Sequence, residues 1–263
     1  MKKVTTKVIQ QTNTEPWYAG MKNLINRELY HERSRMYWIQ QILVWAFFTN
    51  GFVALILGLP TETMGGEASL YITSLATFFS MLALFMSIFI PVLLQGAVID
   101  EKSSGVAAWI LSKPVSKKAY LLSKLSASIL SIIVVSVVIN GAIGYGVFSV
   151  FGYTLNIPGF LINLGLTGIV VAYFASLTIM LGTFASSRGK VLAVAVCLGL
   201  GAQIIARFFP LVLFLIPYSL PIMGIGFITG DPVYGIEWIL LSACIQIIMF
   251  TIIALYAFDR TEL

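Results

Sequence analysis

Six long apolar runs, separated by short polar segments, dominate the pattern of the chain. A helix of about 20 apolar residues crosses the ~30 Å hydrocarbon core of a bilayer, so each run predicts a membrane span. Composition agrees, because 59% of the 263 residues are hydrophobic and only 10% are charged, against roughly 25% charged in soluble domains. We predict an all-α integral membrane protein with six transmembrane helices, at Met36–Leu59, Leu70–Ile99, Leu125–Phe148, Pro158–Ala185, Val191–Ala206 and Ile236–Phe258.

The second run is longer than a bilayer requires. At 1.5 Å per residue it would extend roughly 45 Å, so it must tilt or project beyond the lipid. Pro91 lacks the amide hydrogen that a helix interior uses and can kink the run. We expect the helix to continue past Pro91 into the cytoplasm and to deliver Asp100 and Glu101 into water.

The fifth run ends after 16 residues at Arg207, and the segment that follows is apolar but rich in proline and glycine. A seventh crossing would place Asp231 in an inner loop without a positive charge and would send the C-terminus outside. We therefore predict an outer or re-entrant hairpin over 207–235. Irregular backbone at membrane depth is tolerated where protein or a water-filled cavity covers it.

Positive charge sets the direction of the spans. Fifteen of the sixteen lysines and arginines lie on the same side of the membrane as the N-terminus, in residues 1–35, 100–124, 186–190 and at Arg260. Only Arg207 lies on the opposite side. Because cytoplasmic segments of membrane proteins are enriched in Lys and Arg, both termini are expected in the cytoplasm. The predicted parts are a flexible polar tail (1–20), an amphipathic helix (21–35) and a six-span membrane domain (36–263) with a cytoplasmic loop at 100–124.

The helix over 21–35 allows two interpretations. Its apolar residues, including Leu24 and Leu29, recur at helical spacing with polar residues between them, which suits a helix lying in the membrane interface. An ordinary cytosolic helix leading into the first span fits the same pattern.

Several kinds of chemistry are not indicated. Away from their borders the runs hold no acid or histidine, the groups that intramembrane catalysis and ion coupling use. Cys197 and Cys244 lie in apolar runs without metal-ligand spacing, and GTFASSRGKV (182–191) departs from a phosphate-binding loop. The basic residues border spans, which explains them without nucleic acid. We predict no catalytic residue and no bound metal or cofactor in this chain.

Among the neutral polar residues within or beside the runs, five asparagines and glutamines are candidates for a functional role. They can line a path for a polar substrate, or they can form hydrogen bonds between helices, which contribute roughly 0.6 to 2 kcal/mol each in membranes. Both interpretations apply to Asn50, Asn140, Asn163, Gln203 and Gln246.

The polar stretch IDEKSSGVAAWILSKPVSKKAYLLSKL (99–125) interrupts the apolar pattern. Gly105 permits a sharp change of direction, and the residues after it can form two helical turns with Val106, Trp109 and Ile110 on one side. Pro114 stops that helix, and Ser116 is placed to cap the next one. We predict a short transverse helix facing the cytoplasm. A basic loop anchored by its aromatic residue at the lipid interface is the alternative.

This loop resembles the first cytoplasmic loop of type 2 ATP-binding-cassette (ABC) permeases. The resemblance rests on Glu101-x-x-Ser104-Gly105, on Leu111-Ser112-x-Pro114-Val115-Ser116-Lys117, and on Lys124 before a span. It extends from about Met21, since MKNLINRELYHERSR is similar to the connecting helix of that family. Lys113 departs from the family pattern, in which this position is usually small or polar.

The resemblance implies the permease subunit of an ATP-driven exporter in the cytoplasmic membrane of a prokaryote. Such a subunit pairs with a second permease, identical or related, and with two separate ATPase subunits that hold ATP and Mg. The loop would dock on the ATPase, with Glu101, Ser104 and Gly105 shaping it and Leu111, Pro114 and Ser116 fixing its turn. The docking role of Trp109 comes from its place in the apolar stripe. A membrane scaffold without a substrate path is the alternative function.

Overall fold

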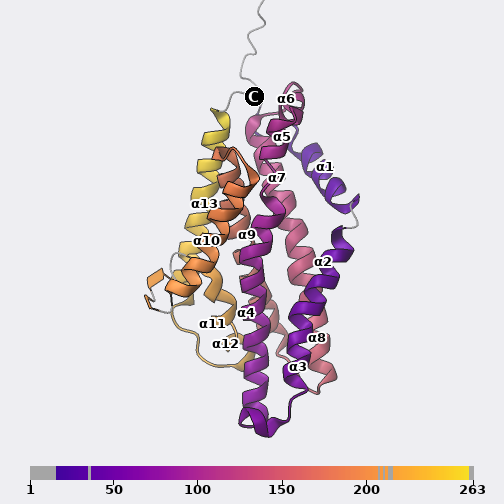
Figure 1. The fold of residues 1–263 in the computed structure, drawn as a ribbon, viewed down its shortest axis with the longest axis vertical. Helices are drawn as coiled ribbons and strands as arrows, with labels where there is room; N and C mark the ends of the chain where they lie inside the picture. Colours follow the sequence, from indigo (N-terminus) through magenta and orange to yellow (C-terminus); the bar gives the residue numbers. More distant parts are fainter. Residues whose placement is uncertain (1–15, 35–36, 207, 210, 213–215, 261–263) are drawn as a thin grey trace, which may run out of the picture.

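The computed structural model describes residues 16–34, 37–206, 208–209, 211–212 and 216–260. The predicted flexible tail falls largely on residues 1–15, which lie outside the described residues. Within the described part the chain is helical throughout, and six helices are long and apolar enough to cross a membrane. The predicted all-α, six-span fold is therefore confirmed (Figure 1).

The first span follows α1 (Met21–Ser34) and consists of α2 (Tyr37–Trp45), a π-helical segment η1 (Ala46–Asn50) and α3 (Gly51–Leu57). A short turn, η2 (Thr61–Met64), leads into α4 (Glu67–Leu94). The third span is continuous through α7 (Lys117–Ile132), a second π-helical segment η3 (Ile133–Ile139) and α8 (Asn140–Val150). The last three spans are α9 (Ile157–Phe184), α10 (Arg188–Ile205) and α13 (Ile236–Asp259).

Helix α9 forms the centre of the bundle. It packs against α4, α7, α10 and α13, and 61% of its most apolar 18-residue window is buried, against 17% for α13. Both helices are apolar on all sides, a pattern that suits a helix surrounded by protein or by lipid. The difference in burial assigns α9 to the protein interior and leaves most of α13 facing outward.

The second span ends differently from the prediction. The helix passes through Pro91 and stops at Leu94; after a turn over 95–98 a separate short helix, α5 (Ile99–Ser103), carries the two acids. Asp100 is half-exposed, but Glu101 is mostly enclosed, with 19% of its side chain exposed. The expectation that both acids reach water was wrong for Glu101, because neighbouring cations enclose it.

The segment before α13 folds back on the bundle without crossing it. Its described residues include the short helices η5 (Pro217–Ser219), α11 (Leu220–Met223) and α12 (Gly226–Thr229). At Gly159 an added Cβ would lie 1.9 Å from the backbone oxygen of Phe227, so α12 lies directly on the backbone of α9. Leu220 is fully buried, so the described part of 207–235 packs on the bundle as a hairpin, and the choice between an outer and a re-entrant hairpin stays a prediction.

Candidate functional site

One end of the bundle gathers α1, α5, α6 (Val106–Leu111), the start of α7 and the C-terminal end of α13 (Figure 1). We call this the docking end, after the role that the sequence predicts for its loop. Lys117 Nζ donates to the backbone oxygen of Asp259 at 2.9 Å, and the ring of Tyr120 stacks on Phe258 with centroids 5.2 Å apart. The described start of the chain and the end of the last span therefore lie on the same side as the loop over 100–124.

The short helix predicted after Gly105 forms, as α6. Gly105 adopts φ 73°, a left-handed conformation that allows the chain to turn between α5 and α6. Helix α6 ends at Leu111, before the exposed Pro114. Ser116 caps α7 by accepting a hydrogen bond from the amide of Ala119 at 3.0 Å. Its hydroxyl also donates to the backbone oxygen of Trp17, which joins the loop to the segment before α1.

The predicted stripe on α6 needs correction. Ala107 and Ile110 form the buried side, while Trp109 is 61% exposed. The ammonium group of Lys113 lies 3.7 Å from the centre of the Trp109 ring, within the range of a cation–π contact. Trp109 therefore presents a large aromatic surface away from the bundle.

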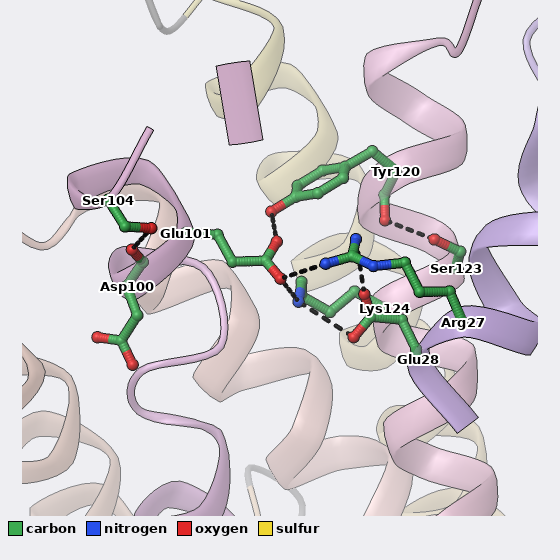
Figure 2. Close-up of polar contacts among 8 residues, drawn as sticks. All are labelled: Arg27, Glu28, Asp100, Glu101, Ser104, Tyr120, Ser123 and Lys124. Atoms are coloured by element: carbon green, nitrogen blue, oxygen red, sulfur yellow. Dashed lines mark hydrogen bonds and ion pairs between the residues drawn. The ribbon is translucent and has the colours of Figure 1, made fainter. Parts of the chain in front are cut away.

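Four charged side chains from three helices form a compact cluster, shown in Figure 2. Lys124 Nζ lies 3.2 Å from Glu101 Oε1 and 3.3 Å from Glu28 Oε2. Arg27 approaches Glu101 and Glu28 at 3.6 Å. We call these residues, Arg27, Glu28, Glu101 and Lys124, the charge cluster. Its two positive and two negative side chains balance in charge, and only 6% of the Lys124 side chain is exposed.

Tyr120 extends the charge cluster towards α13. Tyr120 lies on α7, one helical turn before Lys124. Its hydroxyl donates a hydrogen bond to Glu101 Oε2. Because the same ring stacks on Phe258, Glu101 on α5 is joined to α1, α7 and α13 through one carboxylate.

Helix α5 has two further connections. The Nε atom of Arg188, at the start of α10, donates to Asp100 Oδ1 at 2.6 Å, and Lys102 Nζ donates to the backbone oxygen of Thr183 near the end of α9 at 3.3 Å. The hydroxyl of Ser104 donates to the backbone oxygen of Asp100 at 2.7 Å and closes the carboxyl end of α5. Three residues of α5, Asp100, Glu101 and Lys102, therefore connect the loop to α1, α7, α9 and the start of α10, and Tyr120 extends the connection to α13.

A cavity of about 460 Å³ opens beside the charge cluster, between α2, α4, α7 and the start of α10. Along α7 and η3 the cavity wall changes from charged at Lys124, through polar at Ser128 and Ser131, to apolar at Val135. The cavity is large enough for a small amphipathic molecule. The residues that line it include Gln41 and Gln95 but none of the five polar residues predicted to line a path.

Those five polar residues lie in four separate places. Asn50 and Asn140 bond to each other at 2.6 Å; Asn163 donates to the backbone oxygen of Pro221 at 2.9 Å and holds the hairpin. Gln203 donates to Ser87 at 3.3 Å, and Gln246 to Ser242 on its own helix at 3.0 Å. Each makes a contact within or between helices, and their role as a substrate path stays a prediction.

Sequence reasoning missed several residues of this end. Glu28, Arg27, Tyr120 and Arg188 were not among the predicted site residues, although the acids and bases flanking the spans were visible in the sequence. Which of them pair depends on the packing of α1 against α7, and no local spacing specifies that contact. Within the described residues no three His, Cys, Asp or Glu side chains gather as metal ligands.

The fold and the ion-paired loop define a multi-pass helical membrane protein with a polar docking end. A model of the ABC-2 family transporter proteins matches residues 23–263. The chain belongs to this family, whose members are transmembrane transport subunits, and the resemblance to type 2 ABC permeases is confirmed. No curated protein matches the chain.

Proposed function

We propose that this chain is the permease subunit of an ATP-driven exporter, and that its loop over 100–124 docks on a separate ATPase which binds ATP and Mg. Two ATPase subunits and a second permease, identical or related, would complete the transporter. The cytoplasm of a prokaryote would lie at the docking end, in agreement with the basic residues there. Family membership supports the transport role, and the geometry of α5 supports the coupling.

The connections of α5 carry this proposal. A displacement of α6 is transmitted through Gly105 to α5. From α5 it reaches α1 and α7 through the charge cluster, α9 through Lys102 and α10 through Asp100. Ion pairs and hydrogen bonds that link rigid helices move them together, as coupling between an ATPase and membrane helices requires.

The exposed side of α6 provides the contact with the partner. Trp109 and Lys113 combine an aromatic surface with a positive charge, and aromatic residues on an exposed face are the type that dominates binding at interfaces. The partner surface is therefore expected to hold an apolar slot beside acidic side chains.

Co-purification tests the docking role. We would compare the native chain with Trp109→Ala and with Trp238→Ala, because both tryptophans are 61% exposed but lie on α6 and at the start of α13, near opposite ends of the bundle. Trp109→Ala should reduce recovery of an ATP-binding protein at least tenfold, the effect of a residue that contributes about 1.4 kcal/mol to binding, whereas Trp238→Ala should leave it unchanged. Equal recovery with both variants would contradict docking through α6.

A further inference from the structure

Two π-helical segments lie in neighbouring spans of the membrane domain, each packed against the other span. Segment η1 interrupts the first span and η3 interrupts the third, and the two spans pack so that α2 contacts η3 while η1 contacts α8. The π-helix is rare and occurs frequently at functional sites. Here two of them meet at one contact between neighbouring spans.

Buried polar side chains gather at this contact. Thr49, Asn50, Ser136 and Asn140 are each at most 3% exposed. Asn50 Nδ2 donates to Asn140 Oδ1 at 2.6 Å. Within the described residues the remaining polar atoms of these side chains, Thr49 Oγ1, Asn50 Oδ1, Ser136 Oγ and Asn140 Nδ2, have no hydrogen-bond partner.

Buried hydroxyls elsewhere in the spans behave differently. Those of Ser74, Thr167 and Thr178 each donate to the backbone oxygen four residues earlier in the same helix. An α-helix places that oxygen within reach of a Ser or Thr hydroxyl, whereas the wider π turn, with its i→i+5 bonds, displaces it. Within the described residues of the spans, the two buried hydroxyls that have no hydrogen-bond partner, those of Thr49 and Ser136, belong to η1 and η3.

Measured towards the ends of α3 and α8 the contact lies deep in both spans, while the cavity beside the charge cluster reaches Val135, the neighbour of Ser136. Asn50 lies seven residues from the end of α3 and Asn140 ten residues from the end of α8, which is at least about 10 Å at the helical rise. Lipid offers no hydrogen-bond partner at this depth, and buried polar groups in native proteins nearly always have one.

We propose that the contact between the first and third spans, at η1, η3 and the start of α8, binds water. The available groups are complementary, since the Asn140 amide donates, the Asn50 carbonyl accepts and the two hydroxyls do either. A buried water molecule makes two to four such bonds. Asn50 and Asn140 then belong to a closed hydrated contact rather than to a substrate path.

Such a contact would give the first and third spans a place to slide against each other. A π segment can become α-helical by shifting its hydrogen bonds by one residue, and exchangeable water can satisfy the side chains in either arrangement. This inference concerns the membrane domain alone and does not depend on an ATPase partner.

Thermal unfolding of the purified full-length chain tests the proposal. Thr49→Val and Ser136→Ala remove one partner of the water and should each lower the Tm by about 2–4 °C. The double variant should lose less than the sum, because the two hydroxyls share the bound water. Thr178→Val, which removes a buried hydroxyl bonded to its own helix, is the matched control and should change the Tm less.

Whether the Tm falls or rises in these variants decides between a hydrated and a dry contact. A buried hydroxyl that has no partner is replaced by a methyl group at no cost or with a gain in stability. If Thr49→Val and Ser136→Ala raised the Tm or left it at the level of the Thr178→Val control, the contact would be dry and the proposal would be overturned.

Discussion

The docking end and the hairpin are held to the bundle by different kinds of contact. At the docking end, charged side chains from α1, α5, α7 and α10 pair across helices. At the hairpin, contact is made at the level of the backbone, through Gly159 against Phe227 and through the Asn163 amide on Pro221. Charges that border water can be paired and re-paired, whereas irregular backbone at membrane depth must be covered by close packing and internal hydrogen bonds.

The largest effect is expected from removing both carboxylates of the charge cluster. Glu28→Gln with Glu101→Gln leaves the enclosed ammonium of Lys124 without a counter-charge, which should cost about 3–5 kcal/mol of unfolding free energy. Denaturant unfolding of the purified protein measures this loss. Glu62→Gln with Glu67→Gln, two exposed acids beyond the other end of the spans, is the matched control, and an equal effect of the two pairs would contradict the role given to the cluster.

A smaller effect is expected at the hairpin. In Gly159→Ala the added carbon would collide with the backbone oxygen of Phe227, and overpacking of this kind typically costs about 1–3 kcal/mol. Gly165→Ala on the same helix, where an added Cβ meets nothing within 4 Å, should be neutral or slightly stabilising. Protease cleavage of the hairpin should accelerate in the first variant only; unchanged cleavage in both would mean that α12 is not seated on α9.

The smallest effect on stability is expected from the pair between Asp100 and Arg188. Their side chains are 43% and 62% exposed, and exposed ion pairs contribute about 0–1 kcal/mol. Asp100→Asn should therefore shift the Tm slightly, and less at 1 M salt, where the Debye length falls to about 3 Å. A large loss independent of salt would show that Asp100 has a buried role.

Much of the fold could be predicted from the sequence. The length of an apolar run and its charged borders determine a span almost alone, so the six spans agree with the structure to within a few residues, except where the third begins earlier, at Lys117. The turn into α6 at Gly105 and the cap at Ser116 were also predicted, because both depend on the local chemistry of one residue.

The arrangement of side chains between helices was harder to predict. Glu101 turns towards Lys124 and Arg27 because α1 packs on α7, a contact between distant segments. Trp109 lies off the buried side of α6 because that side carries Ala107 and Ile110, and helical geometry turns residue 109 away from both. The two π segments could not be predicted, since their residues are as apolar as those of any span.

The central claim is that the docking loop and the ends of the spans around it move as one body. We would replace Cys197 and Cys244 by serine and place spin labels in two pairs. One pair joins Ala108 on α6 to Ser187 beside the start of α10, both exposed. The other pair joins Ala108 to Tyr234 before α13. Electron paramagnetic resonance of the complex with its ATPase, with and without nucleotide, would give the distances. The account predicts that the distance from 108 to 187 stays constant while the distance from 108 to 234 changes. A changing distance from 108 to 187 would show that α5 does not tie the loop to the spans, and would contradict the account.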